Sequence, residues 1–335
     1  MKENKSVILW LLSGCFLILS MVVIGGITRL TDSGLSMVDW SLVEGAIPPI
    51  NQTDWIELFN KYKQTPEFQK INSDYTLKDF KFIFFWEYLH RMIGRLLGVV
   101  FIFPFLYFLI KKRLNKKLIQ QSLVLFSLGA LQATIGWWMV KSGLVDRPDV
   151  SHYRLAVHLT TAFLTCSYTL WVALPLILKK KNIGNRKVLK YLMFLSLIVI
   201  IQIIYGAFVA GLKAGLAFPT WPKMGAEFIP KEVFSSNPQW NFLNGVFGVQ
   251  FIHRILAIII VIISIIIYYK TKFLKLQSIQ KISLKIIFSL ILIQFVLGVF
   301  TLIYSVPILL AILHQLGAFF LLLSIVYALF VFKSG

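Results

Sequence analysis

Histidines at the mouths of long apolar runs are the residues of this chain best suited to chemistry. The segments FWEYLHRMIGRLLG (85–98) and VQFIHRILAIII (249–260) each place a histidine-arginine pair where a polar loop becomes apolar. Four of the five histidines stand at such boundaries: His90, His158, His253 and His314. An ionisable side chain within an apolar span is costly, and by default it marks a functional site.

Two pairs of histidines at matched depth favour heme ligation, because facing helices can hold heme iron from both axial sides. We expect His90 with His158 to form a first site, and His253 with His314 a second. Small residues follow one turn later on the same helix faces: Gly94, Ala162, Ala257 and Ala318. They leave room for a flat macrocycle. A lone histidine there is more often an interfacial anchor, and zinc is disfavoured because no cysteine or second histidine has metal-ligand spacing.

Arginines accompany the histidines within one or two turns, namely Arg91, Arg95 and Arg254. Guanidinium groups pair well with carboxylates, and heme carries two propionates. We therefore expect Arg91 to bind the heme of the first site and Arg254 that of the second. The alternative is that these side chains extend to lipid headgroups.

One acidic residue distinguishes the two sites. Glu87 lies three residues before His90, whereas the matching residue before His253 is Gln250. A carboxylate there can take a proton, hold a water or stabilise a developing cation, so we predict that Glu87 is catalytic. The first site is then reactive, and the second is a permanent heme that passes electrons. The alternative is an interfacial acid that pairs with Arg91.

The elements that position these residues are membrane spans. Of the 335 residues, 58% are hydrophobic and 14% are charged, well below the roughly one quarter charged that is typical of soluble domains. Apolar stretches of about 20 residues are long enough to cross a bilayer. We count eight, near 7–28, 87–110, 118–139, 155–178, 190–210, 247–269, 282–303 and 307–332. The fold class is therefore an all-α integral membrane protein.

The charge distribution predicts the orientation. The net charge of +20 is concentrated in short loops at 111–117, 179–187 and 270–281, and only Glu3 among the acids falls on their side. The positive-inside rule places these loops and both termini in the cytoplasm. The heme sites then face outward, beneath a loop at 29–86 in which we expect one or two short helices. This pattern favours lipid contact and no role with nucleic acid.

The chain repeats itself. GGITRLTDSGLSMVDW (25–40) matches GAFVAGLKAGLAFPTW (206–221), which pairs Gly25 with Gly206 and Trp40 with Trp221. The pattern Gln-x-x-x-Gly occurs in LQATIG (131–136) and again in IQFVLG (293–298). We predict two parallel four-helix bundles, residues 1–185 with the first, reactive heme site and residues 186–335 with the second, permanent heme.

Together with AVHLTTA (156–162) and LHQLGA (313–318), these segments resemble heme A synthase over nearly the whole chain, in order. The chain is similar to the proteobacterial and mitochondrial subtype, because it has the long first outer loop. It lacks the loop cysteine pairs of the other bacterial subtype, since Cys15 and Cys166 both lie within predicted spans.

The resemblance implies an oxidoreductase of the cell inner membrane. It would oxidise the C8 methyl group of heme O to a formyl group by two successive hydroxylations, and so yield heme A for terminal oxidases. The substrate-heme ligands fall on His90 and His158, the reactive-site glutamate on Glu87, and the heme b ligands on His253 and His314. Expected partners are heme O synthase, a ferredoxin-type or quinone electron donor, the lipid bilayer and further copies in a homo-oligomer.

Two other functions fit part of the pattern. A diheme b-type electron carrier would use the same four histidines but would need no Glu87 and no difference between the two sites. A transporter also suits parallel repeats, but transporters usually break helices at the membrane midplane. Here the polar residues lie at the outer ends of the spans.

Overall fold

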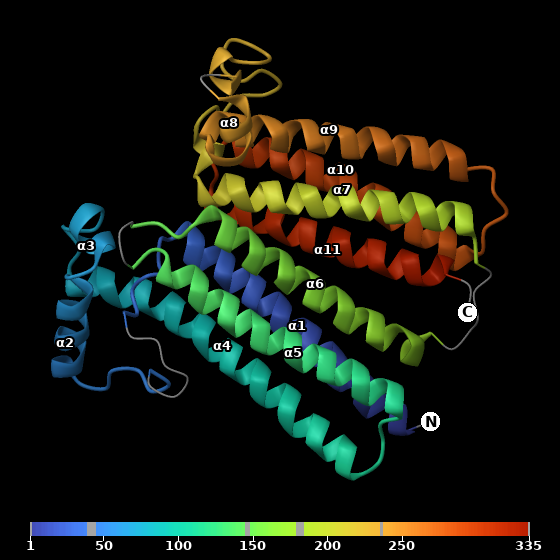
Figure 1. Ribbon diagram of the computed structural model, residues 1–335, viewed down its shortest axis with the longest axis horizontal. Helices are drawn as coiled ribbons and strands as arrows, with labels where there is room; N and C mark the ends of the chain where they lie inside the picture. The colour runs from blue at the N-terminus through green and yellow to red at the C-terminus, as the bar shows by residue number, and fades with distance from the viewer. Residues whose placement is uncertain (1, 39–44, 145–147, 179–183, 235–236, 334–335) are drawn as a thin grey trace. The chain divides into compact units, whose positions relative to one another are not determined.

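The computed structural model of the chain describes residues 2–38, 45–144, 148–178, 184–234 and 237–333 (Figure 1). Eight helices in these ranges are long and apolar enough to cross a membrane. They are α1 (Lys2–Leu30), α4 (Leu77–Ile110), α5 (Lys116–Lys141), α6 (His152–Ile177), α7 (Arg186–Gly211), α9 (Val246–Thr271), α10 (Ser278–Ile303) and α11 (Ile308–Phe332). The predicted all-α class with eight spans is confirmed.

Five short elements complete the described structure. They are α2 (Gln52–Tyr62), α3 (Pro66–Lys70), η1 (Ala214–Leu216), η2 (Lys231–Phe234) and α8 (Pro238–Asn244). The first two are the short helices expected in the loop at 29–86. Trp40, which the repeat pairs with Trp221, lies outside the described residues, as does part of the basic loop at 179–187.

Helix α4 begins well before the apolar run that predicted it. Thr76 and Asp79 form a capping box, in which the Asp79 carboxylate accepts from the Thr76 backbone N–H at 2.9 Å and from its hydroxyl at 2.6 Å. This cap starts the helix at Leu77 rather than near residue 87. His90 therefore lies about four turns into α4, at about 3.6 residues per turn, and not in the first turn or two as the hydropathy pattern suggested.

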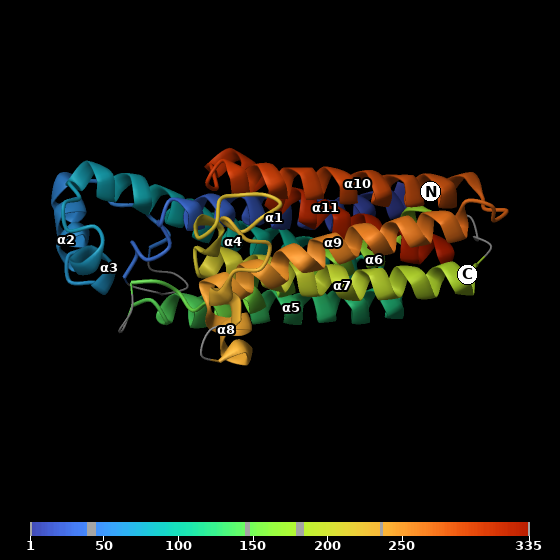
Figure 2. The same cartoon turned by 90° about the horizontal axis from the view of Figure 1, so that it is seen from above.

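The chain forms two compact units. The N-terminal unit is Ser13–His158, and the C-terminal unit is Met1–Leu12 with Leu159–Gly335. In the N-terminal unit, α4 packs against α5 and against α2. In the C-terminal unit, α7 lies against α9 and α11, while α10 packs against α9 and α11 (Figure 2). The division into bundles at residues 185 and 186 stays a prediction from the repeat.

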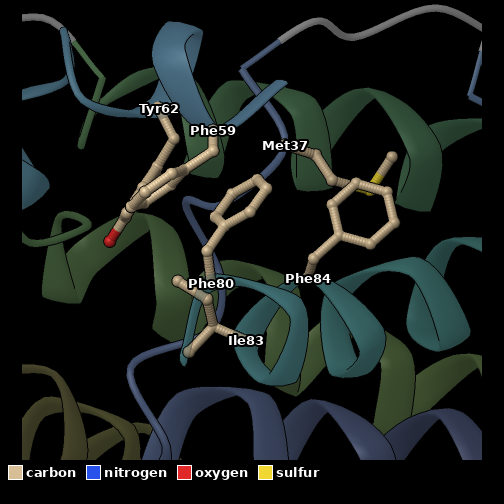
Figure 3. Packing of buried hydrophobic residues seen from close by; sticks show 6 residues of the cluster. All are labelled: Met37, Phe59, Tyr62, Phe80, Ile83 and Phe84. Atoms are coloured by element: carbon tan, nitrogen blue, oxygen red, sulfur yellow. The ribbon is translucent and has the colours of Figure 1, made fainter. Parts of the chain in front are cut away.

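An aromatic cluster joins the short helices α2 and α3 to the start of α4 (Figure 3). Its buried members are Met37, Phe59, Tyr62, Phe80, Ile83 and Phe84. Phe59 and Tyr62 lie three residues apart on one face of α2, and the Tyr62 ring stacks on Phe80 with centroids 5.2 Å apart. We call α2, α3 and the residues that pack on them the cap. Its cluster includes the side chain of Met37, which belongs to the loop after α1.

The cap buries an acidic residue. Glu67 is 4% exposed, and its Oε2 accepts a hydrogen bond from the Tyr62 hydroxyl at 3.1 Å. Asn72 in turn donates to that hydroxyl at 2.9 Å. Burial raises the pKa of Glu67 to about 8, against the lowering effect of the Tyr62 hydrogen bond, and the negative charges of Glu87 and Asp32 raise it further. Glu67 is therefore mostly neutral at pH 7.

This raised pKa predicts a pH-dependent cap. Between the unfolded pKa near 4.5 and the folded pKa of about 8, the folded chain keeps a proton that the unfolded chain has lost. The stability of the cap should therefore fall as the pH rises through this window. Glu67→Gln should remove that dependence and raise the melting temperature at pH 8. Thermal unfolding at pH 6 and pH 8 measures the change in melting temperature with pH, and the exposed Glu57→Gln serves as the control. Parallel curves for wild type and Glu67→Gln would contradict the prediction.

Candidate functional site

Each histidine-arginine motif packs its imidazole against a glycine of a neighbouring helix. In the N-terminal unit, Cε1 of His90 lies 3.1 Å from the position that a Cβ at Gly25 would take. In the C-terminal unit the corresponding distance between His253 and Gly206 is 3.3 Å. A larger residue would require the ring to shift by a few tenths of an ångström, so glycine serves close approach here rather than backbone conformation.

The other two histidines use the glycines of the Gln-x-x-x-Gly pattern. Cε1 of His158 lies 3.2 Å from a Cβ built at Gly136, and Cε1 of His314 lies 2.9 Å from one built at Gly298. All four predicted ligands therefore rest on a glycine at matching positions of the two sequence copies. This agreement supports the internal repeat.

The two histidines of the second site face each other. The ring centroids of His253 and His314 are 6.4 Å apart, with the ring planes at 82°. Two metal–nitrogen bonds of about 2 Å, with about 1 Å more from each nitrogen to its ring centre, span nearly this separation. At the first site, His90 and His158 are close enough to interact electrostatically. One metal ion between the rings fits the second site.

A macrocycle fits these sites better than a bare metal ion. Among the described residues, no group of three or more His, Cys, Asp or Glu side chains could hold a metal. The further ligands of an ion between two imidazoles must then come from elsewhere. Nδ1 of His90, His253 and His314 is buried without a hydrogen-bond partner in the described part of the chain. A buried ring nitrogen without a partner is costly, so these three imidazoles are not satisfied by the described protein atoms alone.

Glu87 is held by three donors. Its Oε2 accepts from the Ser36 hydroxyl at 2.7 Å and from the Met37 backbone N–H at 2.9 Å. Its Oε1 accepts from Arg91 Nη2 at 2.6 Å. Glu87 is 4% exposed, and these donors satisfy both of its buried carboxyl oxygens. The pair with Arg91, which the sequence left as an alternative, is present alongside the loop contacts.

The same loop position is used in both sequence copies. Arg91 donates to the Met37 carbonyl at 3.1 Å, and Arg254 donates to the carbonyl of Phe218, the residue aligned with Met37, at 2.7 Å. Arg254 also donates to the carbonyls of Thr220 at 2.9 Å and Lys223 at 3.3 Å. Each arginine therefore fixes the loop that follows the first helix of its copy.

The two sites differ in charge. Gln250 takes the place of Glu87 and donates to the Phe218 carbonyl at 3.3 Å. Arg91 is thus balanced by a carboxylate, whereas the described partners of Arg254 are neutral carbonyls. Arg254 Nε and Gln250 Oε1 are buried without partners in the described residues. The second site keeps a positive charge and an open donor beside His253, which suits an anionic group.

Sequence reasoning missed three contributors. Ser36 and the Met37 backbone lie about fifty residues before Glu87 in the chain, and no periodic pattern connects them. The repeat offered one signal, because Ser36 aligns with Ala217, a residue whose side chain has no donor.

Gln202 begins QIIYG (202–206), a third Gln-x-x-x-Gly that ends at the glycine in contact with His253. Arg95 donates to the Met92 sulfur at 3.6 Å, and its role toward a propionate stays a prediction.

Fold and site together define a helical multi-pass membrane protein with paired imidazoles at glycine-lined positions. The chain belongs to the COX15-CtaA family of cytochrome oxidase assembly proteins, whose sequence profile matches residues 8–326. It is 50% identical to a protein of Flavobacterium psychrophilum over the whole of both chains. It is 51% identical to one of Flavobacterium johnsoniae over 98% of each chain. A protein of Nitrosospira multiformis is 44% identical over 95% of this chain and 91% of its own. All three are named Heme A synthase.

The contacts of Arg254 predict how its loss would act. Arg254→Leu removes all three hydrogen bonds to the carbonyls of residues 218–223, which should free that loop. We expect amide hydrogen exchange in 218–224 to quicken by about tenfold or more, which corresponds to about 1.4 kcal/mol. Hydrogen exchange with mass spectrometry measures it, and the exposed Lys275→Leu controls for loss of charge. Unchanged protection of the loop would show that these bonds do not hold it.

Proposed function

We propose that this chain is a heme A synthase, an enzyme of heme A biosynthesis that acts on heme O within the membrane. Family membership and full-length relatives of that name support the proposal. The reaction we assign is oxidation of the C8 methyl group of heme O to a formyl group by two successive hydroxylations and loss of water. The product, heme A, serves terminal oxidases.

The residues present fit heme. In each site two imidazoles would hold the heme iron, and glycines keep the imidazole rings close to the neighbouring helices. The unpartnered Nε of Arg254 is a buried donor suited to a propionate. We therefore assign His253, His314 and Arg254 to heme b, which when bound supplies a one-electron carrier. We assign His90, His158 and Arg91 to the substrate heme.

The observation that carries the assignment of the reactive site is Glu87. A buried carboxyl group that accepts from Ser36 and Arg91 stands one turn before His90, and the second copy has an amide at the same position. Ser36, Met37 and Arg91 fix the direction of the carboxylate without help from the substrate. Glu87 is then the group that would accept a hydroxyl proton as the twice-hydroxylated carbon loses water, or would steady positive charge on that carbon.

The surroundings of the enzyme follow from its charge pattern. We place it in the cell inner membrane with both termini in the cytoplasm and the heme sites toward the outer side, because the basic loops at 111–117 and 270–281 favour the cytoplasm.

An alkaline phosphatase fused to the C-terminus should be inactive, because this orientation keeps the C-terminus in the cytoplasm. An active fusion would contradict the orientation. Heme O synthase, a ferredoxin-type or quinone electron donor and further copies of the chain are the partners that we propose.

Extraction of the bound hemes tests the function. The chain is expressed with a heme O synthase in a host that makes no heme A, and the hemes are identified by chromatography and mass. Wild type should yield heme A or its hydroxymethyl precursor. Glu87→Gln preserves the shape of the side chain but removes its charge, so oxidised heme should fall by about 100-fold or more while heme O and heme b remain.

The exposed Glu57→Gln serves as the matched control, since its carboxylate lies on the cap surface and pairs only loosely with Lys61 at 3.6 Å. It should yield the same hemes as wild type. If wild type and Glu87→Gln both hold only heme b, the enzyme assignment fails. The diheme b-type electron carrier, which has no need of Glu87, would then take its place.

A further inference from the structure

A glutamine precedes three of the four glycines that support the histidines, in each case by four residues. The three are Gln132, Gln202 and Gln294, and the fourth position, before Gly25, is Met21. Residues four apart share a helix face, so each of these side chains lies one turn from the glycine, on the side of the helix that meets a histidine. The single exception belongs to the first site, beside His90.

In the second site both glutamines donate hydrogen bonds to the backbones of their histidines. Gln202 Nε2 donates to the His253 backbone carbonyl at 3.1 Å and lies 3.4 Å from the ring Nε2. Gln294 Nε2 donates to the His314 backbone carbonyl at 2.6 Å. The amide of Gln294 fits because Gly317 has no side chain, since a Cβ there would collide with Oε1. Each histidine is thus held at its backbone by an amide and at its ring by a glycine.

The same clusters contain complementary atoms without partners. Oε1 of Gln202 and of Gln294 is buried and accepts no hydrogen bond from the described residues. Nδ1 of His253 and of His314 is equally without a partner there. An imidazole that binds a metal through one nitrogen normally donates its other ring N–H to an acceptor, which orients the ring and raises its basicity. The amide oxygens are acceptors of this kind, although neither is bonded to Nδ1 in this structure, where Gln202 approaches the His253 ring at Nε2.

The first site lacks this arrangement at His90. Met21 stands where Gln202 stands in the second copy, and a thioether has no N–H to donate. Its methyl group instead lies 3.5 Å from the position of a Cβ at Gly94, one turn beyond His90. His90 therefore has the glycine support of Gly25 but no amide from this position.

We propose that Gln202 and Gln294 are positioning residues that lock the second histidine pair onto a permanent heme, and that Met21 leaves the first site able to exchange its heme. The inference rests on the proposed function and deepens it. An enzyme that converts one heme into another must release its product from one site while it retains the heme of the other. The same glutamine contacts at both sites would hinder that release.

The test uses the full chain, expressed with heme O synthase and purified in detergent. Variants are Gln202→Met, the reciprocal Met21→Gln, and Leu197→Met as a control that places methionine on an exposed face of α7. Heme b and heme O per chain are measured together with the reduction potential of the retained heme b. Gln202→Met should bind heme b about tenfold more weakly. It should also raise the potential of the remaining heme b, because the imidazole becomes less basic.

Met21→Gln should increase the fraction of chains that retain heme O, and Leu197→Met should match wild type. A merely structural role for Gln202 would lower the yield but leave the potential of the retained heme unchanged, and that result overturns the inference. If Gln202→Met does not fold, the Met21→Gln variant tests the inference instead. The inference is then overturned if Met21→Gln retains no more heme O than wild type. Wild type that holds no heme would instead refute the proposed function, which separates the two failures.

Discussion

The close contact between a buried imidazole and a glycine of the neighbouring helix is the constraint on which the rest of the structure depends. A histidine inside an apolar span must be shielded from lipid and aimed at a partner. The four glycines at Gly25, Gly136, Gly206 and Gly298 allow both, because they bring a helix backbone against the ring. The close spacing of these helices and the placement of the imidazole rings follow from these contacts.

A second layer of contacts distinguishes the two copies. Each arginine beside a histidine holds the loop after the first helix of its copy, through the carbonyl of Met37 or Phe218. Among the described residues, only the loop of the N-terminal unit also binds the carboxylate of this position. The side chain of Met37 is buried in the aromatic cluster of the cap, while its backbone N–H binds Glu87. Met37 therefore links the cap directly to the Glu87 carboxylate.

Sequence alone predicted the eight spans and the pairing of His253 with His314, because hydropathy and the repeat are properties of the chain itself. It misplaced the start of α4, since hydropathy marks the membrane span and the Thr76 cap marks the end of the helix. It could not predict that Ser36 and Met37 meet Glu87, because that contact depends on how the cap folds. The burial of Glu67 has the same origin. Gln202 and Gly206 also form a Gln-x-x-x-Gly pattern. A comparison of the two copies did not reveal it, because the residue aligned with Gln202 is Met21.

The central claim is that two similar histidine pairs hold two different hemes. Heme analysis of His90→Ala beside His253→Ala tests it most directly, with each variant purified as the full chain and its extracted hemes identified by mass. His90→Ala should lose heme O and its oxidation products but keep heme b, and His253→Ala should lose heme b but keep heme O. If both variants lose the same heme, or each loses both in equal measure, the two sites are not distinct and the account is wrong.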